Sequence, residues 1–419
     1  MKKFLCALGA MIMLSGCATE LAGEKADLTT VSFPAGMTVH PNGKIAYVVG
    51  SNFDLDYRSS DGGALYVVDL ENNAILESSK RIGSFGTNVV LTEDAKRGYL
   101  VTRNDDALVW FEISDDGRTI SCPKDRDADN LMKCRVIIDD HPTHVSVTRS
   151  YRETKVRDDN GNETTKRVDF DLLMIAQLSK NSFVTAMTVV TPEDSGDEDY
   201  RFSYETASLV YSASETLWLK GEQFFVTGRA ASDLALIEPI MDADAKVLGL
   251  HVSTRLTVPQ AYSAYKGRGM VMDPARRRLY LVNQYPNSVV RFNVGSLIGG
   301  DAANEMAQAT AVGVLPEDMS KIVWVGNQTN GRLYLSSVTD DSIYIVDPES
   351  LEILNKVSVG RGPYDLWTDA DTGRLLVLHF FENDIWEFDT SDPDAPVMVK
   401  KYLASEDNDD ESSEASAQE

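Results

Sequence analysis

Six charged side chains, each near the end of a short predicted strand, carry the clearest chemical signal in this sequence. Guanidinium groups bind carboxylate or phosphate oxygens through two parallel hydrogen bonds, so several of them around one opening would attract a small anion. The candidate ligand-binding residues are Arg103, Arg229, Arg268, Arg361, His144 and Asp365. In the alternative interpretation, the arginines only form ion pairs with nearby carboxylates, which are Asp106, Asp233 and Asp365.

The first seventeen residues have the layout of an export signal. Two lysines precede an 11-residue apolar run that is too short to span a bilayer, and small residues follow it. The order Leu14-Ser15-Gly16-Cys17 resembles the bacterial lipobox, whose cysteine is acylated and becomes the first residue of the mature protein. The resemblance implies a lipid anchor at Cys17 and an outer-membrane location. The alternative is a cleaved signal followed by an incidental cysteine.

Two further cysteines, Cys122 and Cys134, close a 13-residue loop. In an exported protein such a pair most simply forms a disulfide, which would stabilise the fold by roughly 3 kcal/mol. The loop also carries alternating carboxylates of the kind that Ca²⁺ binds, Asp125, Asp127 and Asp129. However, Asn130 and Val136 stand where a calcium loop has Gly and Glu, so we predict a charged turn and no metal.

Short alternating strands, separated by Gly, Asn, Asp and Pro, recur between residues 36 and 403 and must position these side chains. A period of two with turn residues at the junctions indicates antiparallel strands. Three such strands and a more variable fourth form one unit, with third strands expected near residues 64–70, 107–113, 182–190, 233–240, 288–294, 342–347 and 384–390. A single unit cannot bury both faces, so the pattern predicts an all-β fold, a seven-bladed β-propeller of four-stranded antiparallel blades.

Several of the units share a tyrosine-led strand, a turn that often contains Asn, and a strand that often ends in Asp. The tyrosines of the four clearest units are Tyr47, Tyr99, Tyr280 and Tyr334. This order resembles the YVTN-type β-propeller repeat family over roughly residues 36–403, although the turn Asn is often replaced and the third blade is extended. Relatives of this type include exported binding and scaffold proteins and lactonase-like enzymes. The resemblance therefore implies the fold and leaves the function open.

Propeller topology assigns each connection to one of two faces. Connections from strand two to three and from blade to blade share the upper face, and the others share the lower face. Three long insertions, residues 114–133, 150–167 and 191–199, are thereby predicted on the lower face of blades 2 and 3. The second contains an Asp-Asn-Gly turn typical of a projecting hairpin, and the third has five acids in seven residues. They predict an acidic platform for a protein partner; the alternative is a set of solvated loops.

The chain divides into a signal (residues 1–16), a tether with a closing strand (17–35), the propeller (36–403) and a disordered acidic tail (404–419). One of the segments 28–33 and 397–403 is expected to complete the blade begun by the other terminus. With 65 acidic and 40 basic residues, the net charge of −25 disfavours a nucleic-acid-binding surface.

Contiguous catalytic, haem and phosphate-binding motifs are absent from the sequence. We therefore expect a lipid-anchored outer-membrane protein, facing the periplasm or the cell surface, that acts as a non-enzymatic binding or scaffold protein. It is expected to be a monomer without cofactors, to contact an envelope protein through the lower-face insertions, and to have room for a small anionic ligand in the upper mouth. The alternative is a lactonase-like hydrolase at that mouth, using Arg268, Arg361, His144 and Asp365.

Overall fold

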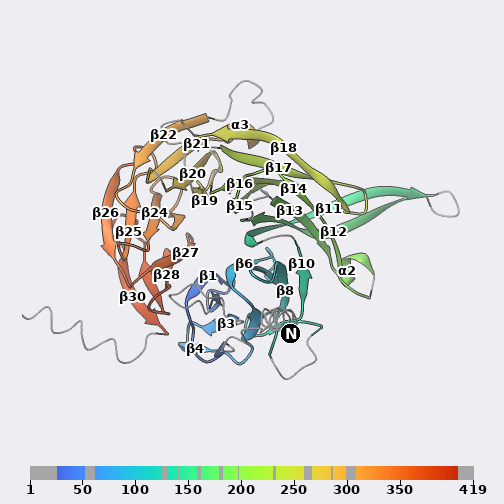
Figure 1. Cartoon of the computed structure of the whole chain (residues 1–419), viewed down its shortest axis with the longest axis horizontal. Coiled ribbons are helices and arrows are strands. Elements are labelled where there is room, and N and C mark those ends of the chain that lie inside the picture. The colour runs from blue at the N-terminus through green and yellow to red at the C-terminus, as the bar shows by residue number, and fades with distance from the viewer. Residues whose placement is uncertain are drawn as a thin grey trace, which may run out of the picture.

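Seven small antiparallel sheets stand around a central axis, and each is built from strands that are consecutive in the chain (Figure 1). The computed structural model describes residues 26–51, 62–124, 130–138, 141–157, 162–178, 183–196, 198–229, 233–258, 267–284, 286–298 and 308–403. The predicted all-β, seven-bladed propeller is confirmed.

Blades 1 and 2 each have three long strands and two short ones that share the outer position. Blade 1 comprises β1 (Pro34–Val39), β2 (Ile45–Gly50), β3 (Gly63–Asp69), β4 (Ala74–Ile75) and β5 (Lys80–Gly83). Blade 2 comprises β6 (Gly86–Leu91), β7 (Arg97–Thr102), β8 (Ala107–Ile113), β9 (Ile120–Ser121) and β10 (Arg135–Ile137).

The other five blades have four strands each, paired in chain order. Blade 3 comprises β11 (Pro142–Arg157), β12 (Glu163–Gln177), β13 (Phe183–Val190) and β14 (Arg201–Ser208), and blade 4 β15 (Ala213–Lys220), β16 (Gln223–Gly228), β17 (Asp233–Met241) and β18 (Val247–Thr257). Blade 5 comprises β19 (Gly267–Met272), β20 (Arg278–Asn283), β21 (Ser288–Asn293) and β22 (Gln308–Val314). Blade 6 comprises β23 (Lys321–Val325), β24 (Arg332–Ser337), β25 (Ser342–Val346) and β26 (Ile353–Ser358), and blade 7 β27 (Pro363–Asp369), β28 (Arg374–His379), β29 (Ile385–Asp389) and β30 (Val397–Tyr402).

Two single-turn helices, α2 (Pro192–Ser195) and α3 (Gly295–Ile298), lie in connections between strands. Among the described residues, no helix has the length and apolar character needed to cross a membrane.

The first strand of every blade lies beside the axis, because the first strands of neighbouring blades contact one another all the way round the ring. The apolar core lies between blades: one buried cluster joins side chains of blades 1, 2 and 3, and another joins blades 7 and 1. The rims of the ring are therefore formed by the connections, which carry the candidate functional residues.

The repeated tyrosines link each blade to the next one. All four are buried, and each hydroxyl donates a hydrogen bond to the following blade. The acceptors are Gly117 O for Tyr47 (2.7 Å), Asp171 Oδ2 for Tyr99 (2.7 Å), Pro348 O for Tyr280 (3.3 Å) and Pro393 O for Tyr334 (2.8 Å). A buried hydroxyl without a partner is costly, so this position favours tyrosine where the next blade presents an acceptor.

Ring closure differs from the expectation. Residues 28–33 form no strand, and β30 pairs with β29 of its own blade, so the predicted closing strand was wrong. Both terminal blades already hold a complete set of strands, which leaves no vacant position to fill. Blades 7 and 1 instead meet through packing and through hydrogen bonds such as that from Phe33 N to Asn383 Oδ1 (2.7 Å).

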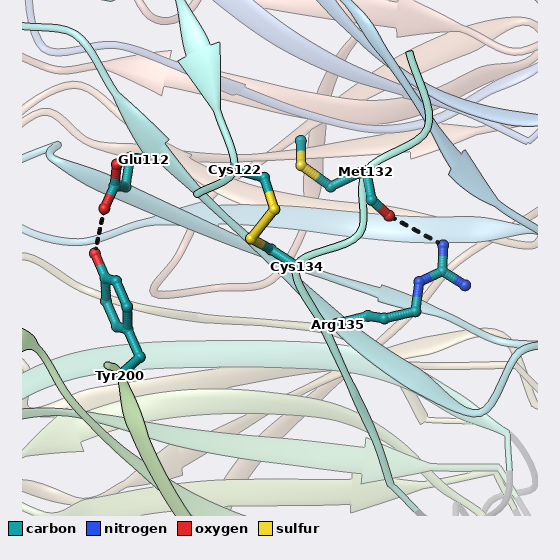
Figure 2. Close-up of a disulfide and its surroundings, with 6 residues drawn as sticks. All are labelled: Glu112, Cys122, Met132, Cys134, Arg135 and Tyr200. Carbon is teal, nitrogen blue, oxygen red and sulfur yellow. Dashed lines mark hydrogen bonds between the residues drawn. A yellow bond between two sulfur atoms is a disulfide. The ribbon is translucent and has the colours of Figure 1, made fainter. Parts of the chain in front are cut away.

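The predicted disulfide between Cys122 and Cys134 is confirmed, with the two Cα atoms 5.6 Å apart. It joins the segments after β9 and before β10, so it holds together the two halves of the outer strand of blade 2 (Figure 2).

The placement of the whole insertion 114–133 on the lower face was wrong. Because β9 and β10 both pair with β8, the loop leaves from the outer edge, and its end contacts blade 1, where Arg81 N donates to Asn130 O at 2.8 Å.

Candidate functional site

A cavity of about 150 Å³ opens on the upper face, where first strands begin and second strands end. We call it the upper mouth. Four of the six predicted ligand-binding residues line it: Arg103, Arg229, His144 and Asp365. Two further charged residues that the sequence analysis missed, Glu215 and Lys321, also line it.

One position near the start of each first strand forms a ring around the upper mouth. In six blades this residue pairs with the penultimate residue of the second strand, and in blade 2 Asn88 occupies the corresponding place. The ring positions are Gly36, Asn88, His144, Glu215, Arg268, Lys321 and Asp365. In β1, β6, β11, β15 and β27 the pairing register shifts beside this position, and such bulges re-aim side chains.

Five of the seven ring residues are held by contacts with the first strand of the following blade. Asn88 Nδ2 donates to Val145 O (2.9 Å), Thr216 N donates to His144 Nδ1 (3.3 Å), Lys321 Nζ lies 3.4 Å from Asp365 Oδ1, and Met37 N donates to Asp365 Oδ2 (2.8 Å). Backbone N–H groups of Gly269 and Met270 act on the Glu215 carboxyl in the same way. The mouth is thus lined by side chains whose positions are already fixed.

Burial controls protonation in the ring. Burial, reinforced by the positive charge of Lys321, lowers the pKa of His144 to about 3, so its imidazole is neutral at pH 7. Burial also raises the pKa of Glu215, while Lys321 and the backbone N–H groups oppose this rise. Burial alone would lower the pKa of Lys321, but Asp365 and Glu215 beside it raise it. Lys321 is therefore a fixed cation between two carboxyl groups.

Arg103 enters the mouth from the end of β7 and differs from the ring residues. Its backbone N–H donates to Phe85 O at 2.8 Å, and burial lowers the pKa of its guanidinium. Within the described part of the chain, no carboxylate forms an ion pair with it. Asp106 and Asp365 do not pair with Arg103, because Asp365 pairs with Lys321 and Asp106 lies beside His141. The side chain of Asp233, the third carboxylate of that alternative, lies outside the described residues.

The remaining two predicted arginines do not contribute a described side chain to the mouth. Arg361 was wrongly placed there: it precedes β27 in the turn between blades, its side chain is 69% exposed, and it lies 3.6 Å from Glu382. The backbone of Arg268 occupies a ring position in β19, and its side chain lies outside the described residues. Glu215 and Lys321 could have been found by aligning the first strands of the blades, because both occupy the same position near the start of a first strand.

On the lower face, the first and second strands of blade 3 continue beyond the sheet as a two-stranded arm, defined here as residues 150–157 and 162–169 (Figure 1). Its strands pair out to Arg157 and Glu163, whereas β13 pairs with β12 only from Asp171 onward. The insertion 150–167 therefore forms the predicted projecting hairpin.

One face of the arm contacts blade 4, and the opposite face, called the free face below, is exposed to solvent. Arg152 binds Glu222 (2.7 Å between Nη2 and Oε2), and Lys166 Nζ lies 3.1 Å from Asp244. Accordingly, Arg152 and Thr154 are half-buried, while the alternate residues 151, 153, 155 and 157 are exposed.

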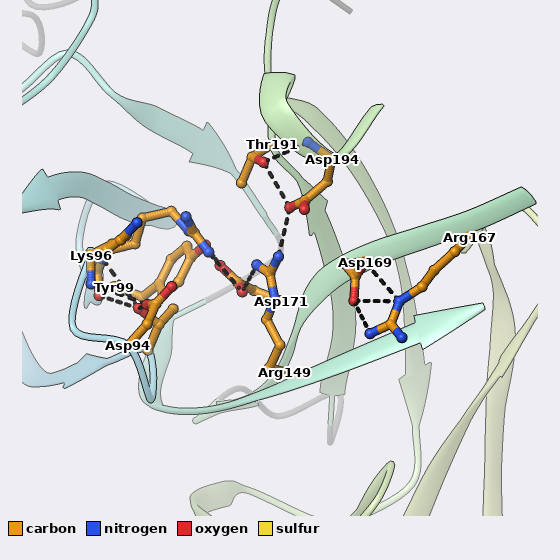
Figure 3. Close-up of polar contacts among 11 residues, drawn as sticks. Asp94, Lys96, Tyr99, Arg149, Arg167, Asp169, Asp171, Thr191 and Asp194 are labelled. Carbon is orange, nitrogen blue, oxygen red and sulfur yellow. Dashed lines mark hydrogen bonds and ion pairs between the residues drawn. The ribbon is translucent and has the colours of Figure 1, made fainter. Parts of the chain in front are cut away.

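A network of buried ion pairs and hydrogen bonds holds the base of the arm in place (Figure 3). Asp171 is fully buried and accepts hydrogen bonds from Arg97 Nε (2.7 Å), Tyr99 Oη (2.7 Å) and Arg149 Nη1 (2.9 Å). Arg149 also donates to Asp194 of α2 at 2.8 Å. Although burial opposes it, Asp171 raises the pKa of Arg97, so the Arg97 guanidinium stays charged.

The predicted acidic platform is only partly acidic. Asp194, from the acidic insertion 191–199, pairs with Arg149, and on the free face of the arm Arg167 pairs with Asp169 (2.7 Å) and Arg157 with Glu163 (3.1 Å). Tyr151 is 50% exposed, and the Arg167 guanidinium lies 4.1 Å from its ring centroid. The free face of the arm is thus a charge-balanced surface with one exposed aromatic side chain near its base.

Some predicted residues lie outside the described part of the chain. They are Cys17, the weak calcium candidates Asp125, Asp127 and Asp129, and the side chain of Asp233. Among the described residues, one cluster has the composition of a metal site, His379, Glu382 and Asp384. There Asp384 already contacts His379 Nδ1 (2.7 Å) and accepts from Trp386 Nε1 (2.8 Å), which assigns it a structural role.

Comparisons with known structures support the fold and do not indicate a function. The β-propeller domain of Cps50 (Swd1) from Myceliophthora thermophila matches with a TM-score of 0.56 and 8% identity, over 86% of this chain and 98% of that domain. Hydrazine synthase from Kuenenia stuttgartiensis matches with a TM-score of 0.55 and 12% identity, over 89% of this chain and 99% of the other. The chain is a seven-bladed β-propeller.

The propeller also resembles the periplasmic gluconolactonase PpgL of Pseudomonas aeruginosa, with a TM-score of 0.50 and 11% identity, over 79% of this chain and 87% of that one. No protein-family model and no curated protein sequence matches the chain. At these identities the likeness concerns architecture alone, so the function must be argued from the two sites of this propeller.

Proposed function

We propose that this propeller is a lipid-anchored protein of the bacterial outer membrane that holds an envelope protein through the free face of its lower-face arm. The lipobox-like residues that end at Cys17 support the anchor and the location. The observation that carries the proposal is the arm itself, a ribbon that projects from the ring on a buried ionic base.

An isolated two-stranded ribbon is only marginally stable in water, so a projecting one needs support. Here the support is concentrated on one side, through Glu222 and Asp244 of blade 4 and through Asp171 at the base. The opposite face is held in position without being covered. A rigid, uncovered face costs little entropy on binding, which suits recognition of a partner.

The residues on the free face also suit a protein contact. Tyrosine and arginine are enriched among the residues that dominate binding energy at interfaces, and Tyr151 and Arg167 lie together on this face near the base of the arm. The balanced charges around them create no repulsion against an acidic partner, although the chain as a whole carries −25. The ribbon also has unpaired edges, to which an extended segment could add as a strand.

The hydrolase alternative has weaker support. A hydrolase needs a group that accepts a proton near neutral pH, and such groups work best when their pKa lies near the working pH. His144 has its pKa lowered to about 3, which makes it a weak base. Asp365 is engaged by Lys321 and by Met37 N–H. The mouth is better suited to binding than to turnover.

Site-specific crosslinking tests the arm. A photo-crosslinking amino acid at Lys155, which is on the exposed face, should capture a discrete envelope protein in intact cells. The same amino acid at Thr154, whose hydroxyl contacts Ala243 O of blade 4, is the matched control and should capture no partner. Capture at Lys155 should fall when Tyr151→Ser is added. Equal capture at both positions, or capture unaffected by Tyr151→Ser, would contradict the proposal.

The anchor is tested separately. Cys17→Ser should prevent acylation and move the protein from the outer-membrane fraction to the soluble fraction. Wild-type protein that labels with no fatty acid, or a Cys17→Ser variant that remains in the outer membrane, would refute the anchor and leave the arm result untouched.

A further inference from the structure

We propose that the upper mouth binds a small carboxylate that carries a hydroxyl group, with its carboxylate on Arg103 and its hydroxyl between His144 and Glu215. This site is separate from the lower-face arm and does not depend on the function proposed for it. Four observations lead to the assignment: the charge state of the lining, the size of the cavity, the gap between two ring residues, and the lack of an ion pair at Arg103.

Among the ring side chains that the structure describes, the charges are largely satisfied within the protein. Lys321 lies between Asp365 and Glu215, and Asp365 also accepts from Met37 N–H at 2.8 Å. His144 is neutral. The ring therefore offers fixed hydrogen-bonding groups and little uncompensated charge.

Arg103 is the exception within the described lining. Its guanidinium is partly desolvated, and no described carboxylate pairs with it. Placing a cation in such surroundings without a counter-charge is unfavourable, and an anionic ligand would relieve that cost. Because Arg presents a planar fork of donors, a carboxylate matches it with two hydrogen bonds.

The cavity limits the ligand to a small molecule. Its volume of about 150 Å³ is well below the roughly 300–1,000 Å³ of pockets that enclose drug-sized ligands. Nucleotides and folded peptide segments are too large. A carboxylate of a few carbon atoms fits, and the carboxyl groups of Glu215 and Asp365 disfavour an anion with a charge of −2.

The gap between His144 and Glu215 supplies the hydroxyl site. Thr216 N–H donates to His144 Nδ1 at 3.3 Å, and Thr216 Oγ1 lies 3.1 Å from the same nitrogen. In the tautomer in which Nδ1 is the acceptor, the imidazole proton is on Nε2 and points to the gap. Nε2 lies 3.8 Å from Glu215 Oε1, too far for a direct hydrogen bond. A hydroxyl placed beside both atoms would accept from Nε2–H and donate to the Glu215 carboxylate, completing both groups.

Isothermal titration of the mature protein with glycolate and with acetate tests the assignment. The two probes share a carboxylate and differ by one hydroxyl. Glycolate should bind at least tenfold more tightly than acetate, and Arg103→Gln should weaken glycolate binding at least tenfold. Arg361→Gln is the matched control, because Arg361 lies outside the mouth lining, and should bind as wild type.

His144→Asn tests the hydroxyl contact without removing the acceptor for Thr216 N–H, because the Asn side-chain oxygen can take the place of Nδ1. This variant should bind glycolate no better than acetate, while acetate binding stays unchanged. The proposal is overturned if glycolate and acetate do not bind at millimolar concentration, if inorganic phosphate binds more tightly than glycolate, or if Arg103→Gln and Arg361→Gln behave alike. Circular dichroism and thermal unfolding of each variant separate loss of binding from loss of fold.

Discussion

This propeller has two polar clusters, one at the base of the arm and one at the upper mouth. They contain similar residue types but differ in how completely their polar groups are hydrogen-bonded within the protein. At the arm base, Asp171 is fully buried and every one of its contacts comes from the protein. At the mouth, Arg103 lacks a described carboxylate partner and a gap of 3.8 Å separates His144 from Glu215. A closed cluster holds structure together, whereas an open one has capacity left for a ligand. Charge alone does not mark a binding site; unused bonding capacity does.

The largest expected effect follows from Asp171→Ala. Removing this carboxylate leaves Arg97 buried without a counter-charge and breaks the link to Arg149, so the free energy of unfolding should fall by about 3–5 kcal/mol. Denaturant unfolding measures it. Glu163→Gln, which breaks the exposed pair with Arg157, is the control and should cost at most about 1 kcal/mol. Equal effects of the two variants would mean that the arm base is not a closed structural cluster.

Loss of the disulfide should come next in size. Cys122→Ser with Cys134→Ser should lower the free energy of unfolding by roughly 3 kcal/mol, because the unfolded chain regains the freedom of the loop. Thermal unfolding with and without a reductant measures it, and the reductant should shift only the wild type. Glycolate affinity at the distant mouth should not change. A change there would show that the outer edge of blade 2 and the mouth are coupled.

The mouth has a pH signature that arises from His144. An unfolded histidine titrates near pH 6.5, whereas His144 in the fold has a pKa of about 3. Between these values the unfolded chain binds a proton that the folded chain excludes, so acidification destabilises the fold. His144→Asn removes this contribution. From pH 6.5 to pH 4 the variant should lose roughly 2–3 kcal/mol less unfolding free energy than wild type. Parallel pH profiles of the two proteins would disprove the buried neutral state.

The smallest stability effect is expected at the free face of the arm. Tyr151 is half exposed and contacts Arg167, so Tyr151→Ser should lower the free energy of unfolding by less than about 1 kcal/mol while reducing partner capture severalfold. Chemical unfolding and quantitative crosslinking provide the two measurements. A large loss of stability with unchanged capture would mean that Tyr151 stabilises the fold, like the arm base, and does not bind a partner.

The repeat made the fold predictable from the sequence. Third strands expected near residues 107–113 and 288–294 appear as β8 (Ala107–Ile113) and β21 (Ser288–Asn293), because alternation and turn residues act locally. The pairing of Cys122 with Cys134 was predictable because the two cysteines close a short loop in a chain expected to be exported.

The composition of the mouth was predictable only in part. Glu215 and Lys321 were missed because their place depends on register and on bulges, which single residues do not reveal. Arg361 was misplaced because a turn residue two positions before the strand faces solvent instead of the ring. The exit of the loop between the cysteines was misjudged because the outer strand of blade 2 is interrupted in its middle, which the hydrophobic pattern does not show.

The tyrosine hydrogen bonds described for the fold all run in one direction, from a blade to its successor. Since a chain is synthesised from its N-terminus, each of these hydroxyls lacks its acceptor until residues of the following blade have been made. Each of these four blades therefore completes its tyrosine hydrogen bond only when the following blade is in place. The seam between Asp365 and Met37 N–H joins the last blade to the first, so the circle can close only after nearly the whole chain has been delivered.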